Sequence, residues 1–222
     1  MRLLLPALLS LLLALPAPAL YAKTTMTTPA LHAAAARNDA EAILTELRSG
    51  TPIDTRDAQG RTALLRATQG NYINAAKALI DAGADVNAKD DMQDSAYLYA
   101  GARGHLEILK LTLAHGADLR STNRYGGTAL IPAAERGHVE AVRTLIAAGV
   151  DVNHVNRLGW TALMEAIVLS DGGPRHQQIV QLLINAKADV NLADKDGVTP
   201  LTHAKRRGYT VIEKMLVSAG GR

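Results

Sequence analysis

The sequence of 222 residues contains no cysteine and no phenylalanine, and aromatic residues make up only 3% of it. Without cysteine, no disulfide can stabilise the chain, even in a compartment that permits them. Without phenylalanine, the core has to be built from Leu, Ile, Val and Ala. The stability of the fold must therefore come from the packing of small and branched aliphatic side chains.

A large excess of one charge sign is also absent, since the formal net charge is only +3. A nucleic-acid-binding protein presents a basic surface, which this balance of charges does not provide. We therefore expect no nucleic-acid partner. No linker-like or low-complexity stretch divides the sequence, so we expect one continuous domain after its N-terminal segment.

Residues 1–22 have the composition of a cleavable secretory signal peptide. Arg2 supplies a positive start, residues 3–15 are mostly leucine, and small residues lead up to Ala22. Cleavage is expected after Ala22, with Ala19 as the alternative. Removal would take away Arg2 and lower the formal charge from +3 to +2.

A membrane anchor is the other interpretation of the same run. The run is barely long enough to span a bilayer and contains Pro6, both of which favour the signal peptide. No cysteine follows it, which disfavours a lipid-anchored protein. We expect a mature chain with a short N-terminal segment at 23–28 and no membrane insertion, located in a bacterial periplasm or outside the cell.

Five Ser or Thr residues recur at one register along the remaining chain. Each begins a similar six-residue motif, which we call the phrase: TALLRA, SAYLYA, TALIPA, TALMEA and TPLTHA. They are separated by 33, 33, 33 and 38 residues, and they are Thr62, Ser95, Thr128, Thr161 and Thr199. A fixed period of this length indicates a solenoid of repeated supersecondary units.

Residues 57–89 show what one unit contains. Asp57–Gly60 is typical of a turn, and Thr62 is a suitable N-cap for a first short helix. A second helix is predicted over Ile73–Asp81, and Gly83 can take the left-handed conformation that ends it. Each unit is therefore predicted to be two antiparallel helices and a hairpin tip.

Three further sets of equivalent residues recur with the same spacing, and we call each set a column. The helix-ending column holds glycine at five positions and lysine at one: Gly50, Gly83, Gly116, Gly149, Lys187 and Gly220. The turn between the helices holds residues that tolerate positive φ: Asn38, Asn71, Gly104, Gly137 and Gly208. Small residues allow close helix approach at Ala67, Ala100, Ala133, Ala166 and Ala204. Pro132 is expected in the first turn of its helix, where a missing N–H costs little.

These columns resemble the ankyrin repeat. Its threonine-proline-leucine-histidine phrase is most complete at Thr199–His203, and AGADVN at 82–87 and GHVE at 137–140 extend the match. The resemblance implies an all-α solenoid with β-hairpin tips, in about six units near 29–56, 57–89, 90–122, 123–155, 156–193 and 194–222. The histidine that the family places in the phrase is replaced here by Leu65, Leu98, Ile131 and Met164.

The histidines do not form a metal-binding pattern. His105, His138 and His176 share one column with Tyr72 and Tyr209, so the repeat itself accounts for them. The others, at positions 32, 115, 154 and 203, lack the spacing of metal ligands. The sequence also contains no phosphate-binding glycine loop and no nucleophile elbow. We therefore expect no metal, no cofactor and no enzymatic activity.

The hairpin tips are where the chain departs most from the family, whose members generally bind partners with their tips and inner helices. Three successive central tips carry apolar residues where aspartate is usual: Met92, Tyr125 and Leu158. Trp160 lies beside them, and Arg124 and Arg157 precede two of them. Aromatic and arginine side chains are typical of protein interfaces, so we expect these six residues to bind a partner protein. The alternative is that they only seal neighbouring tips.

The 38-residue interval contains five extra residues around 170–174, on the edge opposite the tips. A neutral loop insertion is one interpretation. The other is a secondary contact formed by Asp171, Arg175 and His176.

Together these features predict a monomeric, non-catalytic, secreted scaffold that binds another protein through its tips and concave face. Some secreted bacterial ankyrin proteins are associated with periplasmic catalase function, so one expected role is to assist an envelope enzyme of that kind. The alternative is an immunity-type protein that neutralises a toxin in the same compartment. A hydrolase is a distant third.

Overall fold

The computed structural model describes residues 29–222; the expected signal peptide at 1–22 and the segment 23–28 lie outside the described residues. Twelve helices lie within the described range. One row consists of α1 (Ala30–Ala36), α3 (Ala63–Gln69), α5 (Ala96–Arg103), α7 (Leu130–Glu135), α9 (Ala162–Val168) and α11 (Pro200–Arg206). The other consists of α2 (Ala40–Arg48), α4 (Ile73–Asp81), α6 (Leu106–Ala114), α8 (Val139–Ala147), α10 (Pro174–Asn185) and α12 (Thr210–Ser218).

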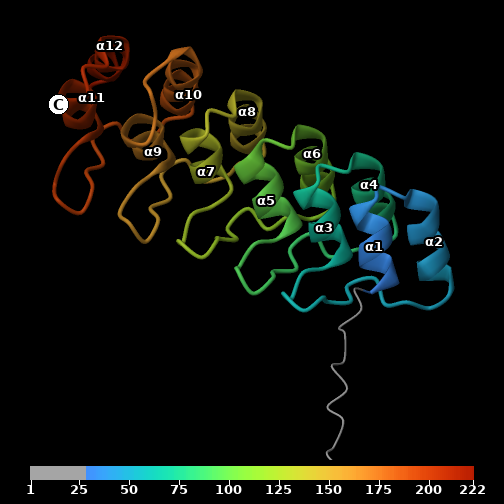
Figure 1. The fold of residues 1–222 in the computed structure, drawn as a ribbon. Helices are drawn as coiled ribbons and strands as arrows, with labels where there is room; N and C mark the ends of the chain where they lie inside the picture. The colour runs from blue at the N-terminus through green and yellow to red at the C-terminus, as the bar shows by residue number, and fades with distance from the viewer. Residues whose placement is uncertain (1–28) are drawn as a thin grey trace, which may run out of the picture.

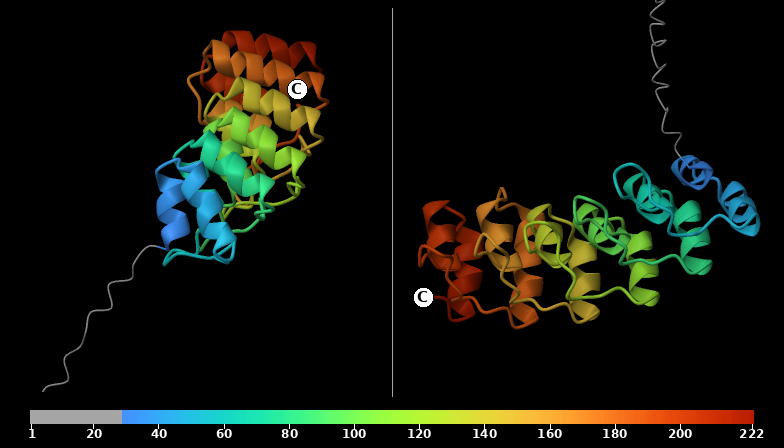
Figure 2. Two further views of the ribbon diagram at one scale, coloured as in Figure 1. Left: turned by 90° about the vertical axis from the view of Figure 1, so that its right-hand side faces the viewer. Right: turned by 90° about the horizontal axis from the view of Figure 1, so that it is seen from below.

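Consecutive helices pair, and six pairs stack side by side into a curved two-layer array (Figure 1). The odd-numbered helices form the inner layer and the even-numbered helices the outer layer (Figure 2). Loops that join one pair to the next project along one edge as hairpin tips (Figure 1). In the part of the chain that the structure describes, no helix is long and apolar enough to cross a membrane.

Small residues let the inner helices approach one another. The alanine column predicted from the period is completely buried at all five positions, Ala67, Ala100, Ala133, Ala166 and Ala204. Larger aliphatic side chains fill the space between the two layers, among them Leu64, Leu109 and Leu163. The positions at which the family has histidine are buried apolar side chains, as at Leu65 and Met164. The array therefore has one continuous core that is mostly aliphatic and also includes the fully buried Tyr97.

Four of the five repeated Ser or Thr residues cap an inner helix, as predicted. The side-chain oxygens of Thr62, Ser95 and Thr161 each accept a hydrogen bond from the backbone N–H three residues later, at 3.2 Å. Thr199 does the same at 3.3 Å. Such caps satisfy N–H groups that a helix leaves unpaired at its start.

Thr128 differs because Pro132 follows it. A proline at this position has no N–H to donate to the Thr128 carbonyl, and the N–H of Ile131 donates to that carbonyl at 3.2 Å instead. The buried Thr128 hydroxyl is then left without a hydrogen-bond partner among the described residues. Pro132 does lie in the first turn of α7, as predicted.

The tips are held by an Asp or Asn side chain rather than by strands, so the expected β-hairpin tips are wrong in that respect. No strand occurs within residues 29–222. In the tip of the fourth unit, Asn123 Oδ1 accepts from the backbone N–H groups of Tyr125 at 2.9 Å and Gly127 at 3.0 Å. The Asn123 N–H donates to the Gly127 carbonyl at 2.9 Å. The same arrangement recurs at Asp57, Asp90, Asn156 and Asp194.

Three of the five residues in the column of histidines and tyrosines bond to the preceding unit, as predicted for scaffold residues. His105 Nδ1 lies 2.9 Å from the Thr68 carbonyl, and His176 Nε2 lies 3.0 Å from the Glu135 carbonyl. The Tyr209 hydroxyl donates to the Ser170 carbonyl at 2.6 Å. Burial lowers the pKa of His105 and of His138, which favours the neutral ring in this position.

Every residue in the two predicted left-handed columns has a positive φ. Lys187 is the one position in the helix-ending column that is not glycine, and its φ is +68°. A residue with a Cβ atom is strained in this conformation by roughly 1 kcal/mol. The Lys187 side chain is exposed, so its replacement removes little packing.

We expect Lys187→Gly to raise the free energy of unfolding by roughly 1 kcal/mol, because glycine relieves the left-handed strain. Chemical denaturation followed by circular dichroism measures the change. Lys187→Ala is the matched control: it also removes the side chain but keeps the Cβ atom, and it should be close to neutral. Equal effects of the two variants would contradict the assignment of the gain to φ.

Candidate protein-binding groove

A cavity of about 400 Å³ opens on the inner face of the array, between the tips and the inner helices of the third, fourth and fifth units. Its walls include Tyr99 and Arg103 of α5, Pro132 of α7 and Leu169 beyond α9. Tip residues close the other side. We call this cavity the central groove.

Three of the six predicted tip residues line the central groove, namely Arg124, Tyr125 and Leu158. The two apolar side chains are 53% and 52% exposed on adjacent tips. The Arg124 guanidinium lies over the Tyr125 ring, 4.8 Å from its centre. This stacking keeps the aromatic ring fixed beside an exposed positive charge.

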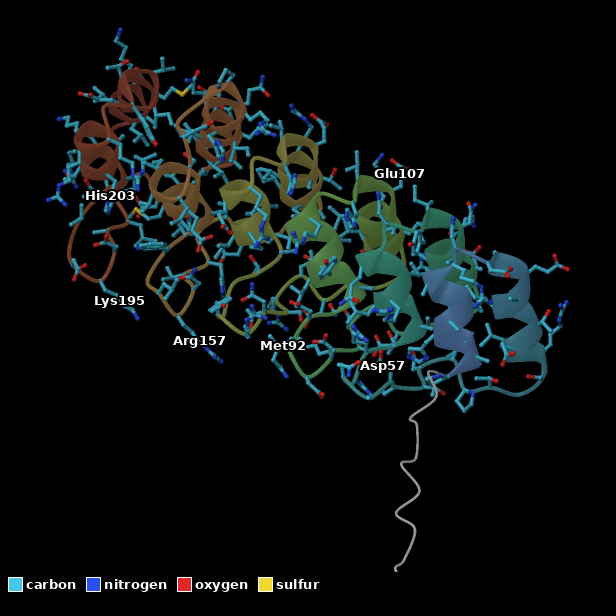
Figure 3. The ribbon with its side chains drawn as sticks, in the orientation of Figure 1. Asp57, Met92, Glu107, Arg157, Lys195 and His203 are labelled. Carbon is cyan, nitrogen blue, oxygen red and sulfur yellow. The ribbon has the colours of Figure 1, made fainter. Side chains whose placement is uncertain are left out.

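The other three lie outside the groove. Met92 is 51% exposed on the preceding tip, and Figure 3 shows it on the edge that also carries Arg157. Arg157 links two tips: its N–H donates to the Tyr125 carbonyl and its guanidinium to the Arg124 carbonyl, both at 2.9 Å. Trp160 is half-buried. The tip edge thus continues the apolar surface beyond the groove.

Glu165 is the residue that sequence reasoning missed. It comes from α9, it lines the central groove, and it is only 5% exposed. Its Oε1 atom accepts a hydrogen bond of 2.8 Å from the side-chain amide of Asn156, which is buried at the base of the tip of the fifth unit. Burial, reinforced by the charge of Glu135, raises the Glu165 pKa to about 7, although Asn156 and Arg136 act in the opposite direction.

Other charged groups surround the apolar side chains. The groove contains the carboxylates of Asp94 and Glu135 besides Glu165, and the guanidinium groups of Arg103, Arg124 and Arg136. Burial is the main cause that raises the pKa of Asp94, and the nearby Asp90 adds to it. The formal charges of the groove therefore balance, but the ionised forms of two of its carboxyl groups, Asp94 and Glu165, are disfavoured.

A column in the sequence would have revealed Glu165. It is the fifth residue of its phrase, and the equivalent residues all differ in chemistry: Arg66, Tyr99, Pro132, Glu165 and His203. The residues around this position repeat, whereas this one varies. In the sixth unit His203 Nε2 lies 2.7 Å from Asp194, just as Glu165 contacts Asn156 in the fifth. Each inner helix thus places a different side chain behind its own tip.

The five-residue insertion is bound closely to the fold. His176 is buried, with Nδ1 at 3.1 Å from the Asp171 carboxylate and Nε2 on the Glu135 carbonyl. The backbone N–H of Gly173 and this histidine lower the pKa of Asp171. Asp171 and Arg175 are exposed, and only these two of the three predicted contact residues are accessible.

The remaining histidines are engaged within the scaffold. His32 Nε2 lies 2.8 Å from the Arg61 carbonyl, and His154 Nε2 lies 2.7 Å from the Gly126 carbonyl. Between residues 29 and 222, no three His, Cys, Asp or Glu side chains are grouped so that they could hold a metal ion.

Comparisons with known proteins agree on the type of repeat. Residues 6–90 and 97–194 match the family model described as ankyrin repeats (3 copies). The structure is similar to an ankyrin repeat domain from Acinetobacter baumannii AYE, with 67% identity, a TM-score of 0.85, and 86% of this chain and 98% of that chain covered. It is also similar to the ankyrin repeat protein EF0377, with 44% identity, a TM-score of 0.82, and 85% and 96% covered.

A curated relative matches over a shorter stretch. The putative ankyrin repeat protein YahD of Escherichia coli (strain K12) is 51% identical over 57 residues, which is 26% of this chain. The match spans 28% of the length of that relative.

The Glu165 pKa predicts a pH-dependent stability. The folded state raises this pKa from 4.5 to about 7, so the stabilisation of the protonated form is complete below pH 4.5 and is lost as the pH rises through about 7. Glutamine mimics the protonated acid and still accepts the Asn156 hydrogen bond. We expect Glu165→Gln to raise the free energy of unfolding by roughly 1–2 kcal/mol at about pH 8 and by much less at about pH 5.

Urea unfolding at the two pH values measures this difference. Glu107→Gln is the control, because Glu107 is an exposed residue of α6 on the opposite side of the array (Figure 3). It should change stability little at either pH. An equal gain for Glu165→Gln at both pH values would contradict the ionisation argument.

Proposed function

Because the chain belongs to the ankyrin-repeat family, whose repeats are protein–protein interaction scaffolds, we propose that it binds its partner protein in the central groove and along the adjoining tips. The observation that supports this site most is the pair of large apolar side chains, Tyr125 and Leu158, each about half exposed on adjacent tips. Exposed apolar surface of this kind, bordered by arginine, is typical of protein-binding sites.

The geometry favours binding over mere sealing of the tips. A side chain that only sealed its neighbours would be covered by them, whereas Tyr125 and Leu158 face the groove with half of their surface free. The tip backbone is fixed by Asn123 and Asn156, and the tips are joined to each other by Arg157. The site is therefore rigid before a partner arrives, which lowers the entropic cost of binding.

The proposal extends to the cellular setting and to the partner. The composition of residues 1–22 supports export to the periplasm or secretion, and we take the partner to be an envelope enzyme, such as a catalase, that the scaffold assists. Neutralisation of a toxin in the same compartment is the alternative. It would use the same groove but would require very tight binding to one partner only.

The partner-binding surface is tested by the double variant Tyr125→Ala/Trp160→Ala. We expect it to weaken the affinity for a partner protein captured from a periplasmic extract by about tenfold or more, because central aromatic contacts each contribute about 2 kcal/mol. Surface plasmon resonance with the captured and purified partner measures the affinity. Val217→Ala, a change at a 53% exposed side chain of α12, is the control and should leave binding unchanged. Undiminished affinity of the double variant would refute the site.

Export is tested by the N-terminus of the mature protein. When the full sequence is expressed in a Gram-negative host, the periplasmic form should begin at Lys23, or at Leu20 if cleavage follows Ala19. Intact-mass spectrometry of the periplasmic and cytoplasmic fractions distinguishes these products. Recovery of only the uncleaved chain, retained with the cytoplasm or the membrane, would count against the proposed location.

A further inference from the structure

Glu165 is a buried carboxyl group that forms no ion pair with any cation among residues 29–222. Its hydrogen bond comes from the neutral amide of Asn156, which cannot compensate a negative charge. Within residues 29–222, no ion pair involves it, although Arg136 on α7 is near enough to influence it. Nonetheless Glu165 borders the central groove, so a group that enters the groove can reach it.

The arginines of the groove are already engaged. The Arg103 guanidinium lies over the Tyr99 ring at 5.4 Å, and that of Arg124 lies over Tyr125. Arg136 donates to the Ala102 carbonyl at 2.9 Å. Each positive group thus already has a contact within the chain.

The carboxylates of the groove are less well compensated. Among the described residues, the only ion pair of Glu135 is with Arg136, at a long 3.8 Å. No hydrogen bond or ion pair to the Asp94 carboxylate occurs in the same range. Burial raises its pKa as it does that of Glu165, while the charges of Arg124, Arg103 and Arg136 act in the opposite direction. Although the formal charges of the groove balance, Glu165 has no ion pair with a cation within residues 29–222.

We propose that the central groove receives a lysine or arginine side chain from an exposed segment of the partner protein, with its charge on Glu165 and its apolar neighbours on Tyr125 and Leu158. This inference rests on the proposed function and specifies the chemistry of the partner. A volume of about 400 Å³ accommodates a few side chains, and the half-exposed apolar walls suit residues that flank the basic one. An ion pair in this sheltered position discriminates strongly against neutral and acidic side chains.

Such an ion pair forms only with ionised Glu165, so binding should weaken as the pH falls below about 7. Several charged and titratable groups lie on the elements packed around Glu165. Glu135 and Arg136 belong to α7, and Asn156 belongs to the tip. His176 on α10 contacts Asp171, and His203 on α11 contacts Asp194, so both histidines have carboxylate partners of their own. Comparison with Glu165→Gln isolates the contribution of Glu165.

The experiment is selection of a phage-displayed library of random linear peptides on the mature protein. We expect the selected peptides to share a lysine or arginine next to an apolar residue. Substitution of that basic residue by glutamine should weaken binding by about tenfold or more, as should Glu165→Gln in the protein. The two changes together should weaken binding little further, because each removes the same ion pair. Fluorescence anisotropy measures all four affinities, and Glu107→Gln is the matched control.

The outcomes separate this inference from the proposed function. Peptides that lack a shared basic residue, or whose affinity is unaffected by Glu165→Gln but reduced by Tyr125→Ala, would overturn the inference and leave the binding site standing. Failure to select any peptide whose affinity depends on Tyr125 or Leu158 would overturn both. Binding of the basic peptides that is independent of pH between about 6 and 8 would also contradict the ion pair with Glu165.

Discussion

Close contact between successive inner helices is the constraint on which the whole array depends, because a single helix pair cannot bury its apolar sides alone. Five buried alanines make that contact in the stack from Ala67 to Ala204. A larger side chain at Ala133 would move α7 away from α5 and α9, between which it packs. The tips follow their helices, so the distance between Tyr125 and Leu158 is set by the same alanines. The width of the central groove is thus a consequence of core packing.

The same constraint determines where chemical variation is tolerated. Within each phrase the capping Ser or Thr and the buried residues have to recur, whereas the fifth residue faces the inner surface and can change freely. Arginine, tyrosine, proline, glutamate and histidine occupy this position in successive units. Stacking arranges them in one row behind the tips. A partner therefore meets a row of unlike side chains on a uniform support, and the glutamate in that row lies at the central groove.

The features of the fold and the site that could be predicted are those that depend on residues close to one another in the sequence. The helix of Ile73–Asp81, the cap at Thr62 and the left-handed conformation of Gly83 all follow from residues close in sequence, and all were predicted. The β-hairpin expectation was wrong because one side chain, such as Asn123, closes each tip before a strand can form. Glu165 was missed because its burial depends on Asn156, nine residues before it, and on the neighbouring units. His176 was assigned to two roles, and its burial favours the scaffold role over a surface contact.

Burial makes an ionised glutamate at the groove unfavourable in the free protein. Tyrosine and proline fill the equivalent positions of the preceding two units without placing a carboxyl group there, and burial of Glu165 makes the free protein less stable above its raised pKa. Asn156 reduces this cost by one hydrogen bond but supplies no charge. Arg103 and Arg124 lie over tyrosine rings rather than on the carboxylate. A partner that brings a cation can therefore supply the positive charge that Glu165 lacks in the free protein. Because the tips and helices are already rigid, little of the resulting interaction energy is lost in ordering the site.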